Sequence, residues 1–334
     1  MENKVEKPFY PENCVLLAPL SGYTDLPYRR SARRHGCIYA FAEMVDVSSL
    51  AWNHAKSLRM LERGEDETFL GCQLIGSNPD CLARAVEVVN NHGNFDVLDL
   101  NLGCPVPKAS KKFAGAELGR NILAAEKVFK QMASLSRYPV SAKMRIISET
   151  DPAPTVDLAL RLQAAGAVAV TVHGRIKEKI YSGPVFAEII ACVNDALDIP
   201  VIANGGVVDR ESAESLRRIS GCSRIMVARG AMGNPWLFSQ LAATGSQPYP
   251  TVAELAREMR SHMMDMIAYY GEDTALRLGR KILLDYLKGR GYASECRRRA
   301  SLVNSMEAFE DLMALVETGP AAVHHLTVLE QPYL

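Results

Sequence analysis

The stretch Val97-Leu98-Asp99-Leu100-Asn101-Leu102-Gly103-Cys104-Pro105 joins a buried-strand pattern to a tight polar loop. Its first half is a short apolar run, as in a strand that is covered on both faces of a parallel sheet. Gly103 and Pro105 flank the thiol and prevent a helix from starting there. Because most free cysteines are small buried hydrophobes, this spacing alone leaves both a packing role and a chemical role open for Cys104.

The same strand-then-helix unit recurs along the chain. Amphipathic helical stretches follow the apolar runs near 25–35, 48–62, 79–92, 121–136, 155–165, 185–194, 209–219 and 231–240. Eight such units favour a closed (β/α)8 TIM barrel, with an open doubly wound sheet as the alternative, since strand pairing is not visible in a sequence. The predicted strands are Val15–Pro19, Tyr39–Glu43, Phe69–Leu74, Val97–Asn101, Val140–Arg145, Ala169–His173, Pro200–Asn204 and Arg224–Ala228.

Length and composition set the class of the protein. The 334 residues are 48% hydrophobic, which suits a barrel of roughly 250 residues with a smaller appendage. Lys+Arg and Asp+Glu are balanced at 38 each, so an anionic partner must be met by a local patch. The eight cysteines show neither a C-x-x-C pair nor a Cys/His cluster, which argues against metal sites and disulfides. Without a signal peptide or a run of 18 apolar residues, a cytoplasmic location is expected.

Polar and charged side chains stand at or just after the C-terminal ends of the predicted strands. In a barrel these ends converge on one face, where barrel enzymes carry out their chemistry. Each residue alone has a structural explanation, such as bonding to loop backbone, but a whole ring of them indicates a site. The ring consists of Ser21, Glu43, Gln73, Asn101, Lys143, Arg145, His173, Asn204 and Arg229.

Two glycine-containing loops after the last two strands predict a phosphate site. The first is Asn204-Gly205-Gly206, and the second runs through Ala228-Arg229-Gly230 into a helix expected to start near Ala231. Glycines let an anion approach the backbone, and the helix N-terminus and the arginine add positive charge, at the usual phosphate position of a barrel. Lys143 adds a cation for the negative charge of a reduced flavin ring. Together these features predict FMN.

Several motifs, in one order, resemble those of the tRNA-dihydrouridine synthases. The segment Leu17–Asp25 with Arg29 is similar to the opening of that family, and Asn101–Pro105 is similar to its catalytic loop. The resemblance covers about residues 13–300. Its other parts are Lys108 with Gly115-Ala116, Ala142–Arg145, Thr171–Arg175, Tyr181–Gly183, Gly233–Phe238, and a tail motif from Tyr270-Gly271 through Arg277, Arg280 and Lys281 to Tyr286.

The resemblance implies an FMN enzyme that reduces the 5,6 double bond of specific tRNA uridines, with NADPH as reductant. It makes Cys104 the general acid that protonates carbon 5, a role that needs the thiol and not the thiolate. It places Asn101, Arg145 and Arg175 at the uracil or the tRNA. The implied cofactor-binding residues are Pro19, Leu20, Ser21, Gln73, Lys143, His173, Asn204, Gly205, Gly206, Ala228 and Arg229.

The chain beyond about residue 245 changes character. Helical periodicity without strand signals predicts a helical bundle, so that the expected domains are 1–245 and 246–334. Arg277, Arg280 and Lys281 lie on adjacent turns of one basic helix and are expected to meet tRNA phosphates, with a solvated helix face as the alternative. The expected helices cover 252–270, 274–288, 293–303 and 305–317.

Some positions depart from the family pattern and leave the subfamily and the modified uridine open. Phe186, Gly206, Ala228 and Ile282 stand where Trp, Asp, Gly and His are common. Two other functions are alternatives: a flavin barrel enzyme acting on a small free pyrimidine or enone, and a non-catalytic RNA-binding protein. The choice between NADPH and NADH also stays open. We expect a monomer that has no protein partner and does not associate with a membrane.

Overall fold

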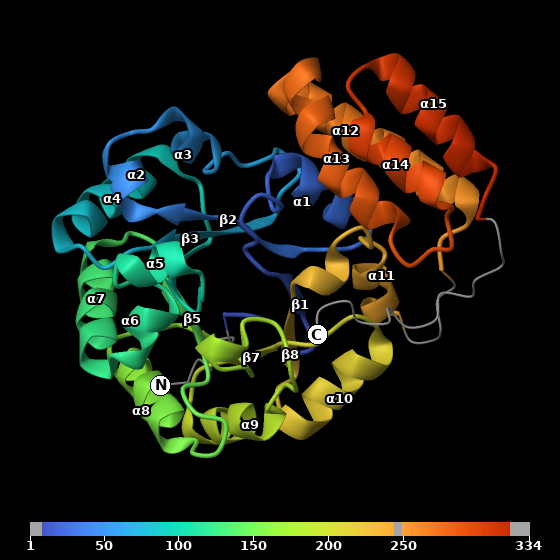
Figure 1. Cartoon of the computed structure of the whole chain (residues 1–334). Coiled ribbons are helices and arrows are strands. Elements are labelled where there is room, and N and C mark those ends of the chain that lie inside the picture. The colour runs from blue at the N-terminus through green and yellow to red at the C-terminus, as the bar shows by residue number, and fades with distance from the viewer. Residues whose placement is uncertain (1–8, 244–248, 321–334) are drawn as a thin grey trace, which may run out of the picture.

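Eight parallel strands close into a barrel (Figure 1). A computed structural model describes residues 9–243 and 249–320. Within these ranges the strands pair in sequence order, and the first pairs again with the last, so the open-sheet alternative is excluded. The strands are β1 (Val15–Leu17), β2 (Tyr39–Asp46), β3 (Phe69–Ile75), β4 (Val97–Leu102), β5 (Val140–Arg145), β6 (Val170–His173), β7 (Val201–Asn204) and β8 (Arg224–Val227).

Helices surround the barrel, and two predictions about them are wrong. The stretch 48–62 forms two short helices, because Asn53 adopts a φ of 52° that a helix does not accommodate. The helix expected near Ala231 begins at Leu237, because Pro235 has no N–H to continue a helix from that point. The barrel helices are α1 (Leu26–Arg34), α2 (Val47–Ala51), α3 (Ala55–Arg59), α4 (Pro79–His92), α5 (Pro107–Lys111), α6 (Ala116–Arg120), α7 (Ile122–Leu135), α8 (Ala153–Ala164), α9 (Ala187–Ala196), α10 (Arg210–Ser220) and α11 (Leu237–Ala242), with 3₁₀ turns η1 (Lys177–Lys179) and η2 (Arg229–Ala231).

Apolar side chains fill the N-terminal half of the barrel interior. Alternate residues of a strand point to the same face, so the inward positions of the eight strands stack in layers. The apolar layers end below Asp99 and Ser141, and polar residues occupy the interior from there to the C-terminal ends of the strands. This floor contains Tyr10, Leu16, Ala18, Phe41, Phe69, Val97, Ala169, Ile202 and Met226.

Four further helices lie on one side of the barrel, beside α1 (Figure 1). They are α12 (Val252–Tyr270), α13 (Glu272–Leu287), α14 (Ser294–Leu302) and α15 (Met306–Glu317), which we call the tail. Arg34 of α1 binds Glu258 at 2.7 Å and Asp265 at 2.6 Å. The tail is therefore fixed to the barrel next to the loop that follows β1. The expected domain boundary between 245 and 246 lies outside the described residues, and none of the described helices has the length and apolarity needed to cross a membrane.

A buried ion pair joins α1 to the loop before β3. Arg29 Nε donates to Glu67 Oε1 at 2.7 Å, Nη2 donates to Oε2 at 2.9 Å, and both side chains are at most 1% exposed. The guanidinium also donates to the carbonyl oxygens of Thr24 at 2.9 Å and Glu62 at 2.8 Å. These bonds hold the end of the β1–α1 loop against the barrel, so the pair fixes one wall of the barrel mouth.

We expect Glu67→Ala to lower the free energy of unfolding by about 3–5 kcal/mol, because it leaves the Arg29 charge buried without its partner. Asp66→Ala is the matched control. Its carboxylate is 54% exposed and binds Arg33 at 3.3 Å, and an exposed pair is worth less than about 1 kcal/mol. Urea denaturation followed by circular dichroism measures both. Equal losses in the two variants would contradict a structural role for the buried pair.

Candidate active site

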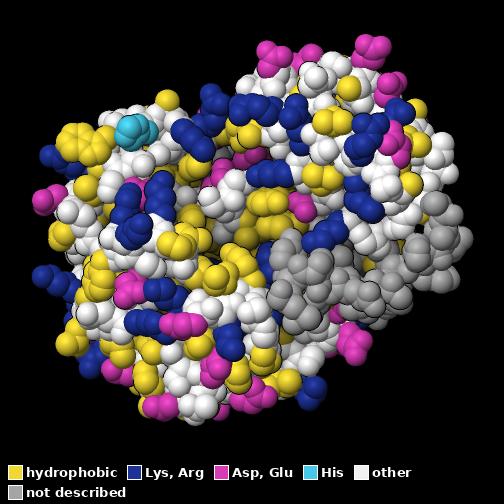
Figure 2. Space-filling view, in the orientation of Figure 1, with side chains coloured by type: hydrophobic (Ala, Val, Ile, Leu, Met, Phe, Trp, Pro, Cys, Tyr) yellow, Lys and Arg dark blue, Asp and Glu magenta, His cyan; other side chains and the backbone are white. Residues whose placement is uncertain are grey.

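A cavity of about 530 Å³ opens at the C-terminal ends of the strands. Figure 2 shows a hollow between the barrel and the tail, with Lys and Arg side chains along its rim. The predicted ring of strand-end residues converges here except for Glu43, whose place in the lining is taken by Met44. A bulge in β2 causes this exchange, because the pairing with β3 shifts register between Phe41 and Met44.

Apart from Glu43, the cavity collects every site residue that the sequence predicts within the barrel. The tail cations Arg277, Arg280 and Lys281 do not line it. The predicted residues in the lining are Pro19, Leu20, Ser21, Gln73, Asn101, Cys104, Lys143, Arg145, His173, Arg175, Asn204, Gly205, Gly206, Ala228 and Arg229. Their spatial convergence is observed, whereas their individual roles stay predictions.

A chain of buried hydrogen bonds leads from the barrel interior to Cys104. Ser141 Oγ donates to Asp99 Oδ1 at 2.6 Å, and Gln73 Nε2 donates to Asp99 Oδ2 at 2.7 Å. Asn101 Nδ2 donates to Gln73 Oε1 at 2.7 Å, and Asn101 Oδ1 accepts the backbone N–H of Cys104 at 2.9 Å. The Asp99 carboxylate can only accept, and the N–H of Cys104 can only donate. The side-chain amides of Gln73 and Asn101 between them therefore have one possible orientation each. The chain fixes the Cys104 loop.

Sequence reasoning missed Asp99 and Ser141 of this series of hydrogen bonds. Asp99 is the central residue of the two. Its signal was present, since a carboxylate within an apolar strand must be bonded to be tolerated. Burial raises the pKa of Asp99 to about 6, against the lowering effect of the bonds from Ser141 and Gln73 and of the Lys143 charge. Asp99 faces Gln73 on one neighbouring strand and Ser141 on the other, which is why the three bond directly.

Asp99 should make the stability of the cofactor-free protein depend on pH. The folded-state pKa of about 6 exceeds the roughly 3.9 of an unfolded chain, so the folded state holds the proton more tightly. The resulting stabilisation is present below about pH 4 and is lost as pH rises through about 6. We expect the unfolding free energy of the parent, relative to Asp99→Asn, to fall by about 2 kcal/mol between pH 4 and 7. Denaturant titrations at both pH values measure it, and an unchanged difference would show that Asp99 titrates normally.

Cys104 is held as a neutral thiol at the edge of the cavity. Its side chain is buried, and burial raises its pKa, opposed by the N–H of Val106 and by the charges of Arg145 and Lys143. Gly115 has a φ of 61°, and a Cβ there would lie 2.6 Å from the Cys104 carbonyl oxygen, so only glycine lets the chain pass this close to the thiol loop. The side chain is therefore a thiol, not a thiolate, at neutral pH.

Four cations surround His173 in the cavity wall. Burial lowers the pKa of His173 well below its usual range, and Lys143, Arg145, Arg175 and Arg229 lower it further, so the imidazole is neutral. Burial and the neighbouring Arg145 lower the pKa of Lys143 to about 7. The described lining has six Lys or Arg side chains against two Asp. This imbalance makes the cavity a site for an anion.

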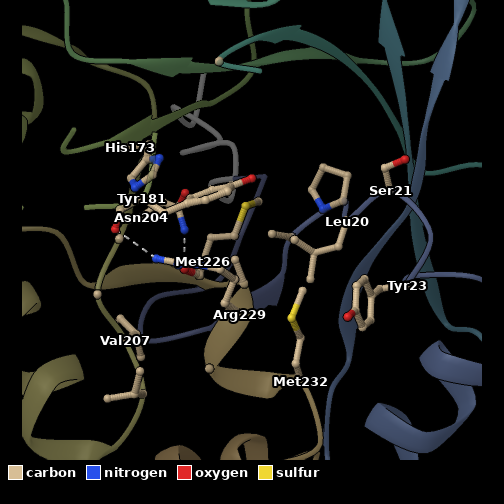
Figure 3. A pocket seen from close by; sticks show the side chains of 18 of the residues that line it. Leu20, Ser21, Tyr23, His173, Tyr181, Asn204, Val207, Met226, Arg229 and Met232 are labelled. Atoms are coloured by element: carbon tan, nitrogen blue, oxygen red, sulfur yellow. Dashed lines mark hydrogen bonds between the residues drawn. The ribbon is translucent and has the colours of Figure 1, made fainter. Parts of the chain in front are cut away.

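Asn204 fixes the position of Lys143. Lys143 Nζ donates to Asn204 Oδ1 at 2.7 Å, and Asn204 Nδ2 donates to the carbonyl oxygen of Met226 at 2.8 Å. Figure 3 shows Asn204 with His173 on one side of the cavity, and Leu20 and Ser21 on the other. The ammonium group is therefore held at one wall by strands β7 and β8.

The loops after β7 and β8 form a backbone cradle. Gly205 and Gly206 have φ values of 129° and 72°, and their N–H groups donate to no acceptor among the described residues. A Cβ on Gly230 would lie 2.2 Å from the Val207 carbonyl oxygen, so the two loops pack backbone against backbone. The helix expected at the second loop begins only at Leu237, so its N-terminus does not contribute to the cradle. The positive charge beside the cradle comes from Arg229, whose guanidinium lies 4.3 Å from the centre of the Tyr181 ring.

Several lining residues were not predicted. The sequence shows that the tail is basic, but it does not show that Lys288 and Arg290 reach the barrel mouth. Arg290 Nη2 donates to the carbonyl oxygen of Gly233 at 2.8 Å, so the tail also holds the loop after β8. In the described ranges, no three His, Cys, Asp or Glu side chains are grouped to hold a metal. The additional lining residues with polar or large side chains are Tyr23, Met44, Tyr181, Asp209, Met226, Met232, Asn234, Tyr249, Asp285, Lys288 and Arg290.

The three predicted tail cations lie in different surroundings on α13. Arg277 is exposed. Arg280 Nε donates to the carbonyl oxygen of Val303 at 2.7 Å, within the tail itself. Lys281 donates to the carbonyl oxygen of Gly22 in the barrel. Contact of all three with phosphates stays a prediction, and Arg277 is the member with its side chain in solvent.

Comparisons with known proteins show the family of the chain. The family model described as "Dihydrouridine synthase (Dus)" matches residues 16–320. A probable tRNA-dihydrouridine synthase of Rickettsia typhi is 34% identical over 307 residues, which cover 90% of this chain and 93% of that protein. A tRNA-dihydrouridine synthase B of Vibrio parahaemolyticus is 32% identical over 300 residues, with coverages of 88% and 92%. On the extent of these matches, the chain belongs to the dihydrouridine synthase family.

Proposed function

We propose that this chain is a tRNA-dihydrouridine synthase that carries FMN, takes reducing equivalents from NADPH and uses Cys104 as its proton donor. The observation that carries the proposal is the presence, in one cavity, of a neutral thiol, a group of cations and a glycine-lined backbone cradle. The family relatives named as tRNA-dihydrouridine synthases support tRNA as the substrate. The enzyme is proposed to act as a cytoplasmic monomer.

The donor set of the cavity fits FMN. The N–H groups of Gly205 and Gly206 and the guanidinium of Arg229 suit a phosphate. A Cβ on Gly205 would lie 3.0 Å from His173 Cδ2, and both glycines have positive φ values that other residues rarely adopt. Lys143 and Gln73 would hold the flavin ring, and Lys143 would supply a positive charge for its reduced form. Bound FMN, once reduced, supplies the hydride that carbon 6 of uracil receives. Lys143, with its pKa near 7, gains its charge when an anion is bound beside it.

The thiol side of the cavity fits a uracil. Cys104 gives its proton to carbon 5, and the N–H of Val106 with the charges of Lys143 and Arg145 stabilises the thiolate left behind. Asn101 is committed to the Cys104 loop through its oxygen, but its Nδ2 also lies 3.6 Å from Met44 Sδ, a weak contact that a uracil carbonyl can replace. Arg175 and Arg145 are proposed to bind the uridine from the β6 and β5 sides.

We expect the purified protein to be yellow and to release FMN, not FAD, on denaturation. The cavity offers one phosphate cradle, and the sequence has no G-x-G-x-x-G motif for a dinucleotide. Chromatography of the released chromophore, before and after reconstitution, identifies it. Recovery of FAD, or failure to bind any flavin, would remove the basis of the proposal.

We expect Cys104→Ala to lower the rate of dihydrouridine formation by about 10²–10⁴-fold, the range for loss of a positioned general acid. Reduction of the flavin by NADPH should be nearly unchanged, because hydride donor and proton donor are separate groups. The assay is mass spectrometry of an unmodified tRNA transcript, with stopped-flow flavin reduction as control. Equal tRNA reduction by variant and parent would make Cys104 a packing residue.

Free uridine as substrate in the same assay distinguishes the proposed function from the main alternative, an enzyme that acts on small pyrimidines. If the parent enzyme reduces free uridine or uracil as efficiently as tRNA, the small-pyrimidine function replaces the proposed one. We expect reduction of tRNA alone, since the open rim between barrel and tail is basic and suits a polyanion. A protein that binds tRNA but reduces neither substrate would favour the non-catalytic alternative.

A further inference from the structure

We propose that Lys281 is a positioning residue of the cofactor site, which acts from the tail by holding the cavity wall Pro19–Tyr23, and not a tRNA contact. The inference rests on the proposed function, because it takes the cavity as the FMN site. Pro19, Leu20, Ser21 and Tyr23 all line the cavity, whereas Lys281 lies behind them. The wall is a loop without regular structure, so its position depends on the contacts made by its other face.

The peptide groups of Gly22 are held from two sides. Lys281 Nζ donates to the carbonyl oxygen of Gly22, and the N–H of Gly22 donates to Glu43 Oε1. Gly22 has a φ of 73°, and a Cβ there would lie 3.1 Å from Lys281 Nζ. Glu43 reaches this peptide because of the bulge in β2, which also removes it from the cavity lining. One cation from the tail and one carboxylate from the barrel thus clamp the turn of the loop.

A second set of contacts joins Lys281 to Tyr23. The Lys281 ammonium lies 4.2 Å from the centre of the Tyr23 ring. The Tyr23 hydroxyl donates to Asp285 Oδ2 at 3.0 Å, and Asp285 is one helical turn beyond Lys281 on α13. The same face of α13 therefore contacts two successive residues of the wall.

Three carboxyl groups of the protein surround the Lys281 ammonium group. Asp25, Glu43 and Asp285 all act on it and raise its pKa, against the larger lowering by burial. Burial raises the pKa of each of these carboxyls, and Lys281 counters that rise. Asp25 also accepts the Tyr270 hydroxyl at 2.7 Å, which ties it to α12. The charge of Lys281 is thus engaged by one buried and two half-buried carboxyls, so it has little to offer a phosphate.

Arg277 provides the contrast on the same helix. It lies one turn before Lys281 and is exposed. At this spacing the two residues share a helix face, so sequence alone gives them the same role. Their surroundings divide the face: its outer end meets solvent, where tRNA phosphates can bind, and its inner end holds the cofactor wall.

The test measures FMN and tRNA affinity separately for Lys281→Met and Arg277→Met. We expect Lys281→Met to weaken FMN binding to the flavin-free protein by about 10- to 100-fold, the range for a lost hydrogen bond from a charged group. Lys281→Arg should restore most of this affinity, since it still donates to a carbonyl. Arg277→Met should leave FMN affinity within about twofold, and should flatten the slope of log tRNA affinity against log salt by about 0.7–0.9. FMN binding is followed by quenching of flavin fluorescence.

A parent-like FMN affinity in folded Lys281→Met, together with a flattened salt slope, would overturn the inference and return Lys281 to the tRNA surface. If Lys281→Met does not fold by circular dichroism, Glu43→Ala takes its place, because it opens the other side of the Gly22 clamp. Unchanged FMN affinity in Glu43→Ala would also count against the clamp. A folded parent protein that binds no FMN would instead show that the proposed function is wrong.

Discussion

Closure of the parallel sheet is the constraint on which the whole site depends. In the pairing of β4 through β7, Asn101 stands beside Lys143, and His173 stands between Arg145 and Asn204. An open sheet would leave its two edge strands far apart and would not form a ring. The filled apolar floor beneath closes the other end of the barrel, so the space for a ligand opens at the face where these side chains meet.

The cations of the cavity are buried close to one another, which disfavours their charged forms. Burial and mutual repulsion lower the pKa of Lys143 to about 7 and that of Arg145 to about 10. Such destabilised groups persist at functional sites because the rest of the fold is stable enough to hold them. Here the buried Arg29–Glu67 pair and the docked tail hold the loops of the mouth. An anionic group in the cavity would relieve the repulsion.

Local patterns predicted the fold and much of the site, because strand runs and strand-end polar residues need no knowledge of tertiary contacts. What they missed depends on neighbours far apart in the chain. The bulge in β2 removes Glu43 from the cavity lining, and strand periodicity does not reveal a bulge. Arg277 and Lys281 share a helix face, yet only the docked barrel loop distinguishes them. Asp99 was visible in its strand, but its partners come from β3 and β5.

The position of the flavin phosphate in a crystal structure of the purified protein is the most direct test of a cofactor site at the barrel mouth. We expect the phosphate within hydrogen-bonding distance of the N–H groups of Gly205 and Gly206 and of Arg229. The ring should lie between Lys143 and the Pro19–Tyr23 wall. A flavin bound elsewhere, or a glycine cradle that stays empty in crystals saturated with FMN, would contradict this assignment.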